Sequence, residues 1–317
     1  MRVREATSNV VGMDDHMDEI DWTFEGTWPH EPRWFDTPDG RMHFVDVGPR
    51  DGRPVVLVHG NPTWGYLFRN FIPPLAASGC RVIVPDHLGF GRSDKPAAAA
   101  IYRVERHAAR LASLLDALDL RDVILVPHDW GGPIALAWAV TRATRVAALA
   151  ILDSFVHPPI ARVSLPLPLR LFRAPGAGEL LVKGAHAIVR GFLFGSGVRH
   201  RDRLTPTVRR AYLAPHRSWG ARTAILALAR ELPDRPGGRV AAFQGEVQRG
   251  LGALASRPVL IAWADQDVVF GEAVLACWRR AFPAAALLRL ADAGHFLQED
   301  AHERIVPALT AFVARTT

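Results

Sequence analysis

Short apolar runs alternate with helix-forming stretches along most of this chain, and this alternation constrains the fold more than any other feature. Apolar runs of strand length occupy residues 54–59, 81–85, 122–127, 146–152, 258–263 and 286–290. Helical patterns occupy residues 104–118, 133–140 and 305–314. Strands that alternate with helices form βαβ units, in which the strands are parallel and covered on both faces. The pattern therefore predicts an α/β fold with a mostly parallel sheet flanked by helices.

The alternation stops at residue 155 and resumes only after residue 250, which predicts an insertion into the sheet domain. The intervening segment is rich in Pro, Gly and Arg and contains helical patterns without a convincing strand. We therefore expect a main domain built from residues 31–154 and 251–317, with a helical cap at 155–250. Residues 1–30 carry an acidic run and no apolar core of a secretory signal, which predicts a flexible extension of a cytoplasmic protein.

Charge is distributed unevenly along the chain. The formal net charge is +6, yet residues 155–250 alone contain 16 Arg or Lys against 5 Asp or Glu. Such an excess is typical of a solvated face, of a contact with a second copy, or of a contact with a membrane surface or acidic partner. Nucleic acid is not expected as a partner, because aromatic residues are not interleaved with the arginines and no nucleic-acid-binding motif accompanies them.

The carboxyl ends of parallel strands are where an open α/β sheet places its sites, so the residues after each strand are the first candidates. Asp129 follows one strand in the sequence HDWGG at 128–132 and precedes a helix. Strand, sharp glycine turn and helix are the frame of a nucleophile elbow, here with an aspartate in place of the usual serine. A carboxylate nucleophile attacks carbon and forms an ester. The alternative is an aspartate that only caps the following helix.

Two later strand ends supply partners for this nucleophile. Asp267 stands in the loop after the strand at 258–263, and His295 stands in the loop after the strand at 286–290. We expect His295 to act as general base and Asp267 to orient it. The chain order of nucleophile, acid and histidine is that of α/β-hydrolases.

Two hydrogen-bond donors are expected opposite the nucleophile. Asn61 lies in the turn after the strand at 54–59, and Trp130 directly follows the nucleophile. These two positions supply the backbone N–H groups of the oxyanion hole in this fold. Asn61 and Trp130 also carry side-chain N–H donors, and two neutral donors in an apolar cleft suit a departing halide.

Three segments carry a resemblance to a known family: HGNPTWGYLFRN at 59–70, PDHLGFGRSDKP at 85–96 and HDWGG at 128–132. Together they resemble the haloalkane dehalogenases, and the likeness extends from about residue 33 to the end of the chain. It implies an α/β-hydrolase fold with an eight-stranded sheet and a cap. The combination of donors and acid is similar to the third subfamily, which grades into the β-lactone decarboxylases of bacterial olefin synthesis. The segment AYLAPHRSWG at 211–220 also resembles those decarboxylases.

The resemblance leaves the orienting acid open, because another branch of the family takes a glutamate from the strand corresponding to 146–152. This chain has Asp153 there, so Asp153 is the alternative to Asp267.

The predicted reaction is hydrolytic dehalogenation of a small apolar haloalkane through an alkyl-enzyme ester, giving alcohol and halide. The first alternative keeps the site and converts a β-lactone to an alkene. An epoxide hydrolase is less favoured because those enzymes use two cap tyrosines, whereas only Tyr212 lies in the insertion. A non-catalytic binding protein would not need the full set of residues. No cofactor is expected, and no metal, since clustered Cys and His ligands are missing from the sequence.

Overall fold

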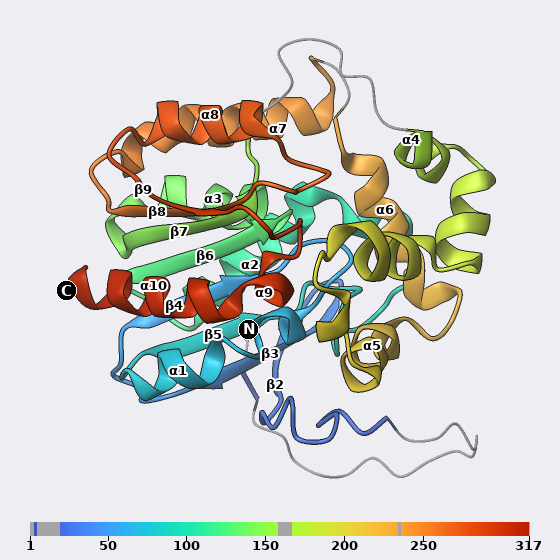
Figure 1. The fold of residues 1–317 in the computed structure, drawn as a ribbon, viewed down its shortest axis with the longest axis horizontal. Helices are drawn as coiled ribbons and strands as arrows, with labels where there is room; N and C mark the ends of the chain where they lie inside the picture. Colours follow the sequence, from blue (N-terminus) through green and yellow to red (C-terminus); the bar gives the residue numbers. More distant parts are fainter. Residues whose placement is uncertain (1–2, 5–19, 158–166, 234–235, 317) are drawn as a thin grey trace.

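A sheet of nine strands forms the centre of the computed structural model, which describes residues 3–4, 20–157, 167–233 and 236–316 (Figure 1). The strand order is β1-β2-β3-β5-β4-β6-β7-β8-β9. The pairs β1–β2, β2–β3 and β3–β5 are antiparallel. The pairs β5–β4, β4–β6, β6–β7, β7–β8 and β8–β9 are parallel. The predicted α/β-hydrolase fold is confirmed, with the two-residue strand β1 added at the edge of the eight expected strands. The strands are β1 (Val3–Arg4), β2 (Arg33–Thr37), β3 (Gly40–Val47), β4 (Pro54–Val58), β5 (Arg81–Pro85), β6 (Val123–Asp129), β7 (Val146–Ser154), β8 (Val259–Ala264) and β9 (Ala286–Leu290).

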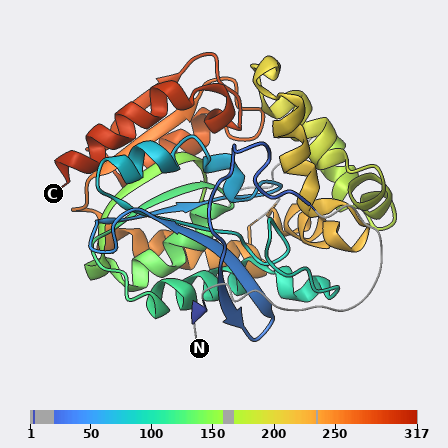
Figure 2. The ribbon, with the colours of Figure 1, turned by 90° about the horizontal axis from the view of Figure 1, so that it is seen from below.

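The central strands are buried because helices cover both faces of the sheet. Helices α1 (Ile72–Ala77) and α10 (His302–Arg315) lie on one face, and α2 (Val104–Ala117) and α3 (Gly131–Thr141) lie on the other (Figure 2). Every residue of β6 is buried, as expected of a parallel strand between two helical layers. This explains why the central strands read as continuous apolar runs in the sequence.

The antiparallel edge was missed in the sequence. Strands β2 and β3 form a hairpin that turns at Gly40, whose φ of +136° favours glycine. Most of β2 is only half-buried. A strand of that kind lacks the continuous apolar run by which the buried strands were identified.

Every regular element in the part of residues 155–250 that the structure describes is a helix, and the segment covers the sheet at the right of Figure 1. Its elements are α4 (Leu167–Arg173), η4 (Glu179–Gly184), η5 (Ile188–Gly197), η6 (Arg201–Arg203), α5 (Pro206–Leu213), η7 (Ala214–His216), η8 (Gly220–Arg222), α6 (Thr223–Glu231) and α7 (Arg239–Gly250). Helix α7 packs against α3, so its contacts lie with the main domain. The domain boundaries remain a proposal.

The predicted N-terminal extension is only partly described. Residues 1–2 and 5–19 lie outside the described residues. Within residues 20–30, Phe24 and Trp28 are buried, and the Trp28 ring lies 5.3 Å from that of Trp64. This part of the extension therefore belongs to the packed body. Among the described residues, no helix combines the length and apolar character needed to cross a bilayer.

Candidate active site

Asp129 stands on a sharp turn between β6 and α3. Its φ is +50°, in the left-handed region that non-glycine residues seldom adopt. The Ser154 hydroxyl donates to the Asp129 carbonyl at 2.7 Å, and a Cβ on Gly132 would lie 2.0 Å from that hydroxyl oxygen. Close packing thus holds the strained turn in place and directs the carboxylate away from the sheet.

The Asp129 carboxylate lies against the turn that follows β4. Its Oδ1 accepts a hydrogen bond from the backbone N–H of Asn61 at 2.8 Å. A Cβ on Gly60 would lie 2.1 Å from the same oxygen, so only glycine permits this approach. Burial raises the pKa of Asp129, while His295 and the N–H groups of Trp130 and Asn61 act in the opposite direction without cancelling it.

His295 lies between two carboxylates. Its Nδ1 is 2.9 Å from Asp267 Oδ2, and its Nε2 is 3.7 Å from Asp129 Oδ2. The first distance is a hydrogen bond and the second is too long for one. Among the described residues Nε2 has no hydrogen-bond partner, although it is buried. The histidine is therefore fixed on one side and free to bind a small molecule on the other.

Electrostatics at His295 favour its charged form. Burial lowers the pKa of His295, but the nearby carboxylates of Asp267 and Asp129 raise it by more, so the net pKa is above the usual value. The Asp267 side chain is fully buried and its Oδ1 accepts from the backbone N–H of Val269. This second bond holds the carboxylate in one orientation towards the imidazole.

Asp153, the alternative acid, makes different contacts. Its Oδ1 accepts from the backbone N–H of Ala264 at 3.0 Å, and its Oδ2 has no partner among the described residues. Burial, with a contribution from the neighbouring Asp267, raises the pKa of Asp153 well above its usual value. The structure thus places Asp267, and not Asp153, against the His295 ring.

Both predicted donors line the same cavity as the carboxylate and the histidine. The Asn61 side-chain amide donates to the carbonyl of Ile225 in α6 at 3.2 Å, so a cap helix sets its orientation. The Trp130 indole packs edge-on to Phe155, with ring centroids 4.9 Å apart. Within the described residues no hydrogen bond uses Trp130 Nε1, which leaves this donor available to a ligand.

The cavity above these groups has a volume of about 560 Å³, which is typical of sites for small organic ligands. Apart from the four groups named above, its lining is almost entirely apolar. Among the apolar cap residues, Ile188 and Phe192 line the cavity, whereas Leu180 is 68% exposed. Tyr212 does not line it, since its hydroxyl donates to Glu299. The remaining lining comes from α4, η5, α6 and the loop after β8: Pro168, Leu169, Phe172, Ala187, Gly191, Ser196, Ala229, Leu232, Val268, Val269 and Phe270.

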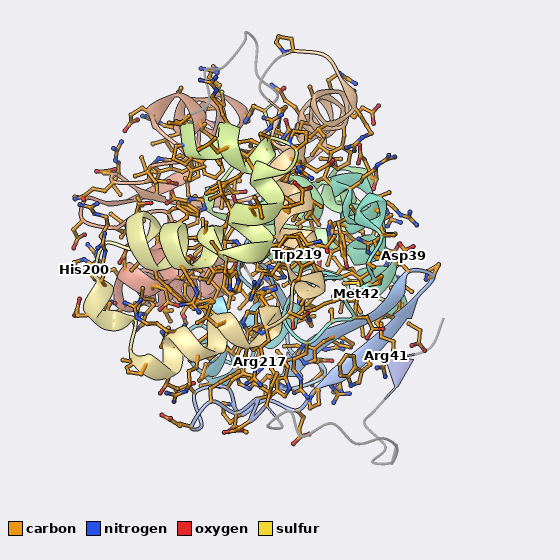
Figure 3. All side chains as sticks on the ribbon, turned by 90° about the vertical axis from the view of Figure 1, so that its right-hand side faces the viewer. Asp39, Arg41, Met42, His200, Arg217 and Trp219 are labelled. Carbon is orange, nitrogen blue, oxygen red and sulfur yellow. The ribbon has the colours of Figure 1, made fainter. Side chains whose placement is uncertain are left out.

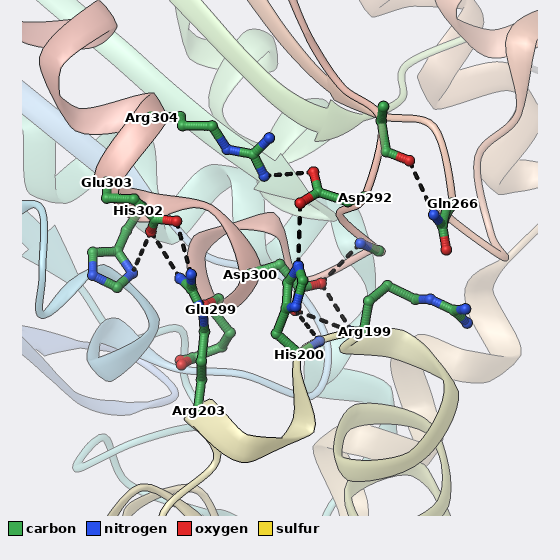
Figure 4. Close-up of polar contacts among 12 residues, drawn as sticks. Arg199, His200, Arg203, Gln266, Asp292, Glu299, Asp300, His302, Glu303 and Arg304 are labelled. Carbon is green, nitrogen blue, oxygen red and sulfur yellow. Dashed lines mark hydrogen bonds and ion pairs between the residues drawn. The ribbon is translucent and has the colours of Figure 1, made fainter.

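Two residues outside the predicted site, His128 and Asp300, fix the histidine loop. His128 Nε2 lies 2.8 Å from the His295 carbonyl oxygen, so this nitrogen donates. Asp300 accepts from the backbone N–H groups of Gly294 (2.8 Å), Arg199 (3.0 Å) and His200 (2.8 Å) (Figure 4). The carboxylate thereby ties the residue before the histidine to the cap segment that follows η5. The sequence signal was the acidic pair at 299–300, which follows the histidine by four residues.

Replacing Asp300 with alanine is expected to destabilise the protein and misplace the histidine loop. The side chain is fully buried, and its loss leaves three backbone N–H groups without their acceptor. At about 1–3 kcal/mol for each unpaired buried donor, we expect the free energy of unfolding to fall by about 3 kcal/mol or more. Urea unfolding measures this, with Asp292→Ala as control, because Asp292 makes only exposed contacts with Arg304 and His200. An equal effect of both substitutions would contradict the role given to Asp300.

Comparisons with known proteins identify the family of this chain. Residues 53–302 match the family model of the alpha/beta hydrolase fold. The chain is 35% identical to a cis-3-alkyl-4-alkyloxetan-2-one decarboxylase of Xanthomonas campestris, covering 90% of this chain and 96% of that one. It is 33% identical to haloalkane dehalogenase 2 of Mycobacterium tuberculosis, covering 89% and 94%.

Among solved structures, the haloalkane dehalogenase DatA of Agrobacterium tumefaciens superposes with a TM-score of 0.81 at 29% identity, covering 90% of this chain and 97% of that chain. The predicted resemblance is confirmed by these matches. The chain belongs to the α/β-hydrolase fold family, as an enzyme related to the haloalkane dehalogenases and to the β-lactone decarboxylases.

Proposed function

We propose that this enzyme is a haloalkane dehalogenase whose nucleophile is Asp129. The observation that carries the proposal is a carboxylate at the elbow, with His295 Nε2 3.7 Å from Asp129 Oδ2. A serine nucleophile must pass its proton to the histidine, so the two lie within hydrogen-bond reach. A carboxylate has no proton to lose, and the histidine is instead free to activate water.

In the first step Asp129 Oδ2 attacks the carbon that bears the halogen. The carbon–oxygen bond of an ester forms as the carbon–halogen bond breaks, and the halide leaves with the bonding electron pair. Asn61 Nδ2 and Trp130 Nε1 are the donors that stabilise it. The Oδ1 atom, which accepts from the Asn61 backbone N–H, becomes the carbonyl oxygen of the ester.

In the second step His295 Nε2 takes a proton from water, whose oxygen attacks the ester carbonyl carbon. Negative charge then develops on Oδ1, where the Asn61 and Trp130 backbone N–H groups stabilise it. The intermediate expels the alkoxide, which takes the proton of the added hydroxyl and leaves as the alcohol, and the Asp129 carboxylate is restored. The proton held by His295 then passes to solvent. Because the ester carries no charge, one of the two carboxylates that raise the pKa of His295 is lost, which favours the neutral imidazole needed as base.

A single turnover in isotopically labelled water tests the covalent ester. Attack at the ester carbonyl places the water oxygen in the Asp129 carboxylate, so the label is expected on the enzyme and not in the first molecule of alcohol. Mass spectrometry of the peptide that contains Asp129 detects it. Label in the alcohol would show direct attack of water on the substrate and overturn the proposal.

The second candidate function, conversion of a β-lactone to an alkene and CO₂, is favoured by the relatives named as oxetan-2-one decarboxylases, one of which matches at 35% identity. The apolar cavity of about 560 Å³ is also large enough to hold alkyl arms. A paired assay separates the two: halide release from 1-bromo- and 1-iodoalkanes, and alkene formation from a cis-β-lactone. Alkene without halide would make the lactone the substrate. The cytoplasmic location and a contact with a second copy remain predictions.

Asp267→Asn is expected to shift the acid limb of the kcat profile to lower pH. Asp267 raises the pKa of His295, so its neutralisation lowers that pKa and the histidine becomes a neutral base at a lower pH. The value of kcat on the pH-independent plateau is expected to fall by about 10³-fold or more, because the imidazole loses the partner that orients it. Stopped-flow halide release across the acid limb measures both effects. Asp153→Asn is the control, and a shift there but not in Asp267→Asn would make Asp153 the orienting acid.

A further inference from the structure

The cavity opens to solvent on the outer face of the cap. Four of the residues that line it are also exposed: Pro168 in α4, Gly191 and Ser196 in η5, and Val268 in the loop after β8. These positions mark the mouth. A substrate therefore reaches Asp129 by passing between α4, η5 and this loop.

Exposed apolar side chains lie beside this mouth and elsewhere on the cap. The described residues include six large apolar side chains with strong exposure, and five of them belong to the cap or to the loop that faces it. Leu167 and Leu171 are 62% and 41% exposed and flank the lining residues of α4, and Val268 is 55% exposed. Leu180 on η4 and Trp219 complete the set, and Trp219 lies near the centre of the face seen in Figure 3. Apolar groups concentrated in this way mark an interaction surface.

Cations lie among these apolar side chains, and acids that would neutralise them are scarce. Residues 167–200 contain five Arg or Lys and one acid, Glu179, which is bound to Arg230 at 2.7 Å. Within the described part of the chain, Arg170, Arg190 and Arg199 make no ion pair. The Lys183 ammonium lies 5.2 Å from the centre of the Trp219 ring.

The acids nearest in sequence to Val268 on the surface are already paired. Asp265 and Glu272 both bind Arg289, at 2.6 and 2.5 Å. Asp267 is buried against His295. The surface around the mouth is therefore both apolar and positively charged.

We propose that this face docks on an anionic lipid bilayer, so that the mouth of the cavity opens into the membrane. The exposed leucines and Trp219 insert at the interface, where such side chains gain free energy by leaving water. The arginines and Lys183 attract the lipid phosphates. The inference rests on the proposed function in one respect: a small apolar substrate dissolves in the bilayer and enters the cavity from there.

The charge and the apolar groups together favour lipid over an acidic protein. A protein partner seated on this face would cover the mouth and close the route to Asp129. A bilayer, in contrast, supplies the apolar molecules for which the cavity is lined.

Vesicle sedimentation tests the proposal with the full chain. We expect binding to vesicles of phosphatidylglycerol and phosphatidylcholine that weakens as salt is raised, and much weaker binding to phosphatidylcholine alone. The Arg170→Gln/Arg190→Gln variant is expected to lose about fivefold in the partition coefficient for each arginine removed. The Leu167→Gln/Leu171→Gln variant is expected to lose binding at every salt concentration.

Matched controls come from the opposite end of the molecule. Leu287 on β9 is 37% exposed, and Arg315 ends α10 beside the C-terminus, away from the cap (Figure 1). Leu287→Gln and Arg315→Gln should bind vesicles like the unaltered protein. All variants should keep their turnover of short, water-soluble substrates, since none of the substituted residues lines the cavity.

The outcomes separate this proposal from the catalytic one. Absence of binding to anionic vesicles overturns the docking surface and leaves the chemistry at Asp129 untouched. Binding that depends on the arginines but not on the leucines overturns insertion of the apolar side chains and shows electrostatic adsorption to the lipid phosphates alone. Binding lost equally in the two control variants overturns the assignment of this face.

Discussion

Asp129→Ala is expected to abolish measurable turnover, with a fall in kcat of about 10⁴-fold or more. The carboxylate forms the ester in the proposed mechanism, and no other carboxylate lines the described cavity. Halide release from 1-bromoalkanes and alkene formation from a cis-β-lactone, measured on the same preparation, report the effect on both candidate reactions.

The matched variant is Asp129→Asn. It keeps the shape of the side chain, removes the charge, and places a residue at φ +50° that tolerates the left-handed region better than alanine does. Both variants should unfold as a single cooperative transition and both should be inactive. Turnover at the level of the unaltered enzyme in either variant would exclude Asp129 as nucleophile.

His295→Gln is expected to stop the reaction after the first step, when the halide has left and the ester on Asp129 has formed. Without a base to activate water, the ester on Asp129 persists, so about one equivalent of halide is released and kcat falls by about 10³-fold or more. Rapid-mixing halide detection shows the burst, and intact-protein mass spectrometry shows the added alkyl group.

The control for this experiment is the double variant Asp129→Ala/His295→Gln, which should show neither burst nor adduct. A burst that survives in the double variant would place the alkylated group elsewhere. Absence of both burst and adduct in His295→Gln would show that the histidine is needed before the halide leaves, which contradicts the two-step mechanism.

The parallel strands and the elbow were predictable because each depends on residues close together in the sequence. Strand β4 (Pro54–Val58) and the run that became β6 are continuous apolar stretches, and a strand buried on both faces has that composition. The two glycines that follow Trp130 predict the sharp turn at Asp129. The order of Asp129, Asp267 and His295 along the chain then indicated the fold.

Other features depend on contacts between distant segments. The orienting acid is one example: Asp153 stands near the carboxyl end of β7 and Asp267 in the loop after β8, and the sequence left both open. The difference is that Asp267 reaches His295 Nδ1, whereas Asp153 binds the backbone of Ala264. The packing of Trp28 against Trp64 escaped prediction for the same reason, whereas the hairpin edge escaped it because β2 is half-buried and lacks a continuous apolar run.

The sequence by itself determined the parallel part of the sheet and the chemical type of the site: a carboxylate at an elbow, a histidine, an acid, and two N–H donors. These features can be predicted from short stretches of sequence, because strand, turn and helix propensities act over a few residues. Only the tertiary structure decided which acid faces His295, that Asp300 ties its loop to the cap, and that the cavity opens among exposed leucines and arginines. These depend on distances between groups far apart in the chain, which the packing of the cap against the sheet sets.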